Sequence, residues 1–310
     1  GKNVPAYRIP HRAGAGRRMR RIWRQGKEDA QEMREKMDEL IDSLCRQGDY
    51  MCLNVLVQRD GETVYSKTAG YADREREIPA REDTIFHLYS MSKPVTAAAV
   101  MKLWEDGLLD LMDPLTRYLP AFREQPVRED GRLVLRQSEI TIQDLLNMTS
   151  GIPYPEGEET PEMSRLFEEA MAKAEGPDAF GTVQLANRIA QTPLVFLPGT
   201  RWRNGASADV LGAVVEVVSG MRFGEYLRRE FFEPLGMEDT GFFIPPEKKD
   251  RLAVIYRMPS GSEPVPYHDK HLVILDSETE PAFQSGGAGL VSTAKDYAAF
   301  MTMLMREGTS

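Results

Sequence analysis

The spacing of hydrophobic residues changes along the chain, and each spacing predicts a different kind of element. Residues 28–44 carry apolar side chains every three or four positions, which predicts an amphipathic helix. Residues 51–58 and 63–67 read as two strands, and the Arg-Asp-Gly-Glu segment at 59–62 is a hairpin signal between them. Residues 95–109 contain a run of small apolar residues with no polar face, which indicates a buried helix.

A polar excursion over residues 69–80 separates the strands from that buried helix. From about residue 110 the pattern becomes one of short helices between loops rich in Pro and Gly, at 140–148, 162–174, 182–191, 210–218 and 223–232. An irregular stretch with extended pieces follows, and then a last helix over residues 295–305. The expected organisation is a basic N-terminal arm (1–27), an α/β sheet domain (28–112 and 275–310) and a mostly helical domain (113–274).

Composition is that of an ordinary soluble globular protein, with 310 residues, 41% hydrophobic and 28% charged. The net charge of −9 argues against a nucleic-acid binder. The arm is arginine-rich between residues 17 and 24, but it lacks interleaved aromatics beyond Trp23, so we expect it to lie against an acidic body. No apolar run could span a bilayer and no secretion signal is visible, which favours the cytoplasm; the first residue, Gly1, leaves a processed or secreted form open.

Cysteines and histidines give weak signals. Cys45 and Cys52 are too few for a disulfide framework; one bond between them is possible, and two buried free thiols are favoured. His268, Asp269 and His271 could suggest a metal site, but an exposed loop is the better interpretation. We therefore expect no metal and no cofactor. Oligomeric state is left open.

The strongest chemical signal is Ser90-Met91-Ser92-Lys93, just before the buried helix. A serine and a lysine three residues apart lie on the same face of a helical turn. Pro94 is tolerated only in a first helical turn and so fixes the helix start beside Ser90. A lysine amine packed away from water loses basicity, and in its neutral form it can take the serine proton during attack on a carbonyl.

The chain contains a second Ser-x-x-Lys pattern, Ser292-Thr293-Ala294-Lys295, which we do not interpret as catalytic. Ser292 follows a glycine-rich loop and precedes the last helix, so we expect it to be a helix N-cap rather than a nucleophile.

Several landmarks together resemble the serine hydrolases related to class C β-lactamases, a group that includes family VIII esterases, D-amino-acid peptidases and penicillin-binding proteins. They occur in family order over roughly residues 30–307 and are Asp83-Thr84-Ile85-Phe86 leading into Ser90-Met91-Ser92-Lys93, Leu145-Leu146 with Thr149-Ser150-Gly151, Pro198-Gly199-Thr200-Arg201-Trp202, Asp209-Val210-Leu211-Gly212, Phe232-Glu233-Pro234-Leu235-Gly236-Met237, and Gly286-Gly287-Ala288-Gly289-Leu290 with Ser292-Thr293. The resemblance implies an α+β fold, with helices around an antiparallel sheet, a helical domain and an active site in the cleft between them. It also implies Ser90 as the acylated nucleophile, Lys93 as its base, and substrate contacts by Trp202 and Gly287.

Two departures from the family pattern stand out. Asn204 occupies the position of the family's catalytic tyrosine, and an amide cannot act as general acid or base, although it could hydrogen-bond to Lys93 or to a substrate. Nearby Ser207 sits in a near miss of a nucleophile elbow and is expected to be structural. Family members also continue past the equivalent of Ser310 into a further strand that completes the oxyanion hole, so C-terminal strands are expected to be missing from this sequence.

The predicted function is a serine hydrolase that forms an acyl-enzyme on Ser90 and acts on small esters, β-lactams or D-amino-acid amides, with esters weakly preferred. The alternative is a catalytically impaired, penicillin-binding-like protein that captures acyl donors without efficient turnover. Asn204 and the missing strand both favour this alternative. Neither interpretation involves nucleic acid or a membrane span.

Overall fold

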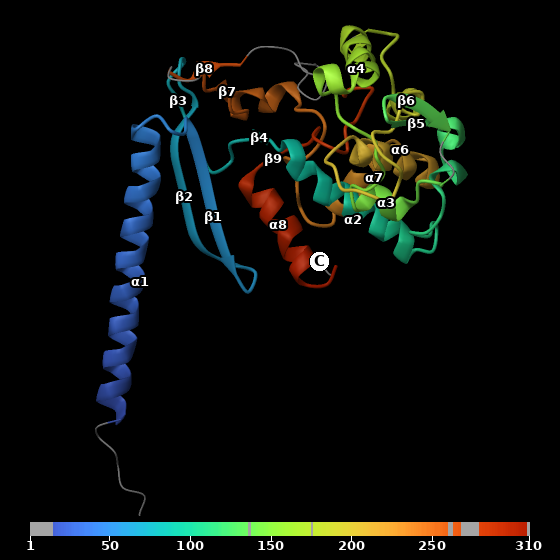
Figure 1. Cartoon of the computed structure of the whole chain (residues 1–310). Helices are drawn as coiled ribbons and strands as arrows, with labels where there is room; N and C mark the ends of the chain where they lie inside the picture. Colours follow the sequence, from blue (N-terminus) through green and yellow to red (C-terminus); the bar gives the residue numbers. More distant parts are fainter. Residues whose placement is uncertain (1–14, 136–137, 175, 260–262, 268–278, 309–310) are drawn as a thin grey trace, which may run out of the picture.

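The computed structural model describes residues 15–135, 138–174, 176–259, 263–267 and 279–308, with side chains from residue 30 onward. The first helix, α1 (Ala15–Arg46), begins thirteen residues before the predicted start at residue 28. Ala, Arg, Lys, Gln and Met dominate the added part, and all of them favour helix. Figure 1 shows this part extending away from the rest of the chain, so the described residues of the expected arm do not lie along the body.

The predicted hairpin is confirmed. Strands β1 (Cys52–Arg59) and β2 (Glu62–Asp73) pair antiparallel, and both turn residues, Asp60 and Gly61, have positive φ. The expectation of a polar excursion over residues 69–80 is wrong, because β2 continues to Asp73 and β3 (Ile78–Pro79) pairs with it. Pairing with β1 as far as Cys52↔Gly70 satisfies the backbone of this segment, which outweighs its polar side chains.

The helices follow the predicted order with small changes of boundary. They are α2 (Ser92–Glu105), α3 (Ile142–Leu146), α4 (Pro161–Lys173), α5 (Thr182–Ile189), α6 (Ser207–Ser219), α7 (Phe223–Leu227) and α8 (Ala294–Met305), with the short turns η1 (Tyr89–Met91), η2 (Leu115–Arg117), η3 (Pro120–Glu124), η4 (Gly157–Glu159), η5 (Arg228–Phe232) and η6 (Pro246–Arg251). Short antiparallel pairs join β4 (Phe86–His87) to β9 (Val291–Ser292), β5 (Pro126–Glu129) to β6 (Arg132–Leu135), and β7 (Tyr256–Arg257) to β8 (Val265–Pro266). The result is the expected mixed α+β architecture.

The main core forms where α2 packs against α6. Val95, Ala99 and Val100 of α2 are fully buried, as are Val210 and Val214 of α6. The expectation of a buried helix after Ser90 is therefore confirmed. The core includes residues of both expected domains, and the division at residues 112 and 275 remains a prediction.

The C-terminal part returns to the first part through β9, as the sequence predicts. β9 pairs with β4, and Leu88 N–H, two residues before Ser90, donates to the Leu290 carbonyl at 2.8 Å.

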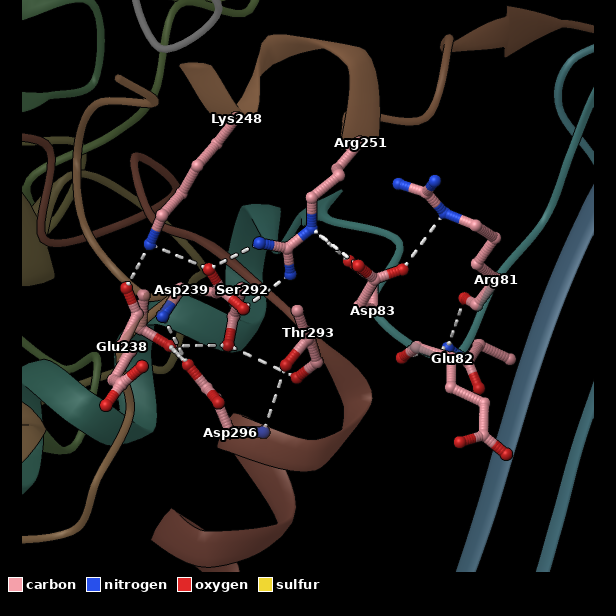
Figure 2. Close-up of polar contacts among 12 residues, drawn as sticks. Arg81, Glu82, Asp83, Glu238, Asp239, Lys248, Arg251, Ser292, Thr293 and Asp296 are labelled. Atoms are coloured by element: carbon pink, nitrogen blue, oxygen red, sulfur yellow. Dashed lines mark hydrogen bonds and ion pairs between the residues drawn. The ribbon is translucent and has the colours of Figure 1, made fainter. Parts of the chain in front are cut away.

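A polar network beside this junction holds the returning segment in place (Figure 2). Arg251 bonds Asp239 with two nitrogens and also contacts the Asp83 carboxylate, while Asp296 accepts from Asp239 N–H at 2.8 Å. The residue that caps α8 is Thr293, not Ser292 as predicted: its hydroxyl accepts from Asp296 N–H. Ser292 lies one residue earlier, in β9, and its buried hydroxyl bonds Thr240 at 2.7 Å.

Candidate active site

Ser90 lies in η1, the single turn that connects β4 to α2. α2 begins two residues later at Ser92, and Pro94 falls in its first turn, as predicted. The residue before Ser90, Tyr89, has φ +46°, a strained value for a side chain of this size. The Ser90 side chain is exposed, so an incoming carbonyl can reach its oxygen.

Lys93 contacts Ser90 directly. Its Nζ lies 2.9 Å from Ser90 Oγ and 2.9 Å from the Gly287 carbonyl oxygen. The side chain is half-buried, and both of these partners are uncharged oxygens. The sequence-predicted pair is thus brought together, with one amine between the nucleophile and a backbone acceptor.

Burial lowers the pKa of Lys93, and the nearby Asp209 carboxylate opposes this shift. A neutral amine keeps two protons and a lone pair. It can donate to Gly287 O and accept the Ser90 proton across the same 2.9 Å contact. The geometry therefore suits an amine that acts as a general base.

The glycine-rich loop at residues 286–290 is held between α2 and α6. Thr96 Oγ1 donates to Gly286 O at 2.8 Å, and Leu290 N–H donates to Ser92 Oγ at 3.1 Å. A Cβ on Gly286 would lie 2.3 Å from the Ala208 carbonyl oxygen of α6. Only glycine fits at this close approach, which explains why the loop lacks side chains next to Lys93.

Two further residues complete the site, and sequence reasoning gave neither of them a role. The Tyr154 ring lies over Lys93, with 5.5 Å from Nζ to the ring centroid, and its hydroxyl donates to Asp209 at 3.3 Å. Asp209 also accepts from Ser285 Oγ–H and from Gly287 N–H. A carboxylate within the otherwise apolar start of α6 was the available signal for Asp209.

Gly287, predicted to contact substrate, uses both of its backbone groups within the site. Its N–H bonds Asp209 and its carbonyl bonds Lys93. Trp202 is 69% exposed. Contact of either residue with substrate remains a prediction.

Asn204 is exposed. Among the described residues, the Lys93 amine forms its hydrogen bonds with Ser90 and Gly287 and none with Asn204. Its assignment to the family's tyrosine position remains a prediction. Ser207 is buried and bonds the Ser150 hydroxyl at 2.8 Å, as a structural residue would.

Cys45 and Cys52 are free and half-buried, so no disulfide joins them. Within the described ranges, no three His, Cys, Asp or Glu side chains are grouped to hold a metal ion. His268, Asp269 and His271 lie outside the described residues.

None of the described helices is both long enough and apolar enough to cross a membrane.

Several known proteins are similar to this chain in sequence. The chain is 36% identical over 284 residues to Esterase EstB of Burkholderia gladioli, an alignment that covers 86% of this chain and 69% of that protein. It is 29% identical over 208 residues to Penicillin-binding protein 4* of Bacillus subtilis (strain 168), covering 65% of this chain and 41% of that protein. The chain spans 58% of the length of another relative, Protein Rv1367c of Mycobacterium tuberculosis (strain ATCC 25618 / H37Rv).

The fold also matches solved structures. EstCE1, described as a hydrolase with promiscuous acyltransferase activity, aligns with a TM-score of 0.74 and 29% identity over 92% of this chain and 74% of that chain. This likeness confirms the predicted β-lactamase/transpeptidase-like fold. A family model described as Beta-lactamase matches residues 31–310, and the chain therefore belongs to the Beta-lactamase family of serine hydrolases, esterases and penicillin-binding proteins.

Proposed function

We propose that this chain is a serine hydrolase that forms an acyl-enzyme on Ser90, with Lys93 as the base. The observation that carries the proposal is the 2.9 Å contact between Lys93 Nζ and Ser90 Oγ, made by a half-buried amine whose pKa burial lowers. Exposure of Ser90 supports access of a substrate carbonyl.

In the proposed reaction, Ser90 Oγ forms a bond to the carbonyl carbon while its proton moves to Lys93 Nζ. Collapse of the tetrahedral intermediate breaks the bond to the leaving group, which takes the proton from the Lys93 ammonium. Water then attacks the acyl-enzyme and gives a proton to Lys93. Collapse of the second tetrahedral intermediate breaks the bond to Ser90 Oγ, which takes the proton back from Lys93, and the acid product leaves. The amine ends each cycle in its starting state.

Small esters are the substrate class we favour, with β-lactams and D-amino-acid amides as alternatives. The named activity of the EstB relative supports esters. An alcohol or amine that takes the place of water would make the same intermediate an acyl donor, a reaction in keeping with the description of EstCE1.

A second candidate function is acyl capture without efficient turnover. Asn204 favours it, because an exposed amide at the family's tyrosine position cannot pass a proton to the leaving group. In this case Ser90 would still be acylated, and the acyl-enzyme would persist.

A chromogenic ester, a chromogenic cephalosporin and intact-protein mass spectrometry separate these functions. Turnover together with a transient adduct on Ser90 supports the hydrolase. A stable adduct on Ser90 without turnover supports acyl capture. The absence of both, in a folded protein that resists labelling at all concentrations, contradicts the two proposals together.

A further inference from the structure

Next to Lys93 lies a buried carboxylate that the proposed reaction does not consume. Asp209, in the first turn of α6, is 3% exposed. Its three donors come from two segments of the chain: Ser285 Oγ–H and Gly287 N–H at the start of the segment that forms the glycine-rich loop, and Tyr154 Oη–H from the loop that precedes η4. A buried charge is tolerated only where such donors surround it, so this cluster is a built feature.

Two of these donors also contact Lys93. Gly287 receives the Lys93 hydrogen bond on its carbonyl at 2.9 Å, while its own N–H reaches Asp209 at 3.1 Å. The Tyr154 ring covers the amine and its hydroxyl reaches Asp209. Asp209 therefore accepts a hydrogen bond from each of the two groups, Gly287 and Tyr154, that contact the proposed base.

Gly287, Tyr154 and Asp209 are closely packed against one another. A Cβ on Gly287 would lie 2.4 Å from Tyr154 Oη and 2.8 Å from Asp209 Oδ2. The three residues are thus in direct contact, and a change in one is transmitted to the position of the amine.

We propose that Asp209 and Tyr154 are positioning residues for Lys93: Asp209 fixes the Gly287 carbonyl that orients the amine toward Ser90, and the Tyr154 ring shields that amine from water. This inference rests on the proposed role of Lys93 as base. It assigns the orientation of the amine to the buried Asp209 and to Tyr154 rather than to the exposed Asn204.

We expect the two residues to act on the protonation of Lys93 in opposite directions. The negative charge of Asp209 raises the pKa of Lys93, and burial lowers it. The Tyr154 ring, with its centroid 5.5 Å from Nζ, is the group that we expect to keep water from the amine. Burial also raises the pKa of Asp209, and the donors that surround Asp209 oppose this shift. Burial beside Asp209 also raises the pKa of Tyr154, so its phenol stays protonated and neutral. Ser90, which contacts the amine, carries no charge, and burial raises the pKa of Tyr297 of α8, which donates to the Met91 carbonyl and is likewise neutral.

The test measures the rate of Ser90 acylation by an aryl ester from about pH 5 to about pH 10, before steady state, because the base must be neutral and its pKa sets the acid limb. In Asp209→Asn the acid limb should move to lower pH by about one unit. Tyr154→Ala admits water to the amine, so its acid limb should move to higher pH. Tyr154→Phe keeps the ring, so its acid limb should lie nearer to that of the wild type.

Asp296→Asn is the matched control. Asp296 is also a buried aspartate in the first turn of a helix, but its partners are Asp239, Thr240 and Thr293 rather than groups at Lys93. Its acid limb should coincide with that of the wild type.

Equal acid limbs for Asp209→Asn and Asp296→Asn would overturn the inference. If Asp209→Asn does not fold, the Tyr154→Ala and Tyr154→Phe pair decides: coincident limbs overturn the shielding role. Failure of the proposed function has a different signature, since the wild type itself would then show no adduct on Ser90 by mass spectrometry.

Discussion

Gly287→Ala is a small change at the point where the amine, Asp209 and Tyr154 meet. The added methyl would lie 2.4 Å from Tyr154 Oη and 2.8 Å from Asp209 Oδ2, distances that real Cβ atoms do not tolerate. Because Asp209 is buried and held by several donors, we expect the loop to move instead and the Lys93–Gly287 bond of 2.9 Å to lengthen or break.

The magnitude follows from that bond. A hydrogen bond between uncharged groups contributes about 0.5–1.5 kcal/mol, and about 1.4 kcal/mol corresponds to a factor of ten in rate. We therefore expect kcat/KM for an ester to fall by about two- to ten-fold, with the larger share of the loss in kcat, since the amine is proposed to act in the chemical step.

The assay is initial-rate ester hydrolysis, with thermal unfolding of the same samples. Gly241→Ala is the matched control, because a Cβ there meets nothing closer than 3.7 Å, and it should keep its activity. A folded Gly287→Ala protein with the wild-type rate would refute the reasoning that the Gly287 carbonyl orients the base.

Three further predictions concern other parts of the chain. Ser90→Ala should abolish covalent labelling and Ser292→Ala should preserve it, as mass spectrometry of the labelled variants would show; loss of labelling in Ser292→Ala alone would reverse our choice between the two patterns. Asn204→Tyr should raise ester turnover, and an unchanged rate would mean that position 204 does no proton work. Arg251→Ala removes two hydrogen bonds to Asp239, which keeps Lys248 as a partner at 2.8 Å, and should lower the free energy of unfolding by about 1–3 kcal/mol in urea titration, while specific activity of the folded fraction persists; an unchanged midpoint would argue that the Arg251–Asp239 pair of Figure 2 contributes nothing to stability.

Local patterns predicted the elements whose causes are local. The turn at Asp60-Gly61 and the helix start at Pro94 each depend on a few neighbouring residues, and both were predicted at the right place. The hairpin of β5 and β6 around Asp130-Gly131 carries the same kind of turn signal, since both of these residues have positive φ, but it was not recognised.

Predictions failed where tertiary pairing determines the structure. The sequence pattern groups residues 69–73 with the charged run that follows them, but they form the end of β2 because β1 and β3 satisfy their backbone. Ser292 and Thr293 are equally good caps in sequence. Pairing of β9 with β4 places Ser292 in the sheet, which leaves Thr293 as the residue that caps α8.

The proposed catalytic pair and the residues packed around it differ in the same way. Ser90 and Lys93 are three residues apart, so one helical turn brings them together and spacing alone predicts their contact. Tyr154 and Asp209 are 55 residues apart, and Asp209 and Gly287 are 78 residues apart. No periodicity relates these positions. They meet because α6 packs on α2 and because glycine lets the loop at residues 286–290 pass between these helices. Spacing can therefore identify the pair that we propose to react, whereas the groups that we propose to control the protonation of Lys93 follow only from the packing of the core.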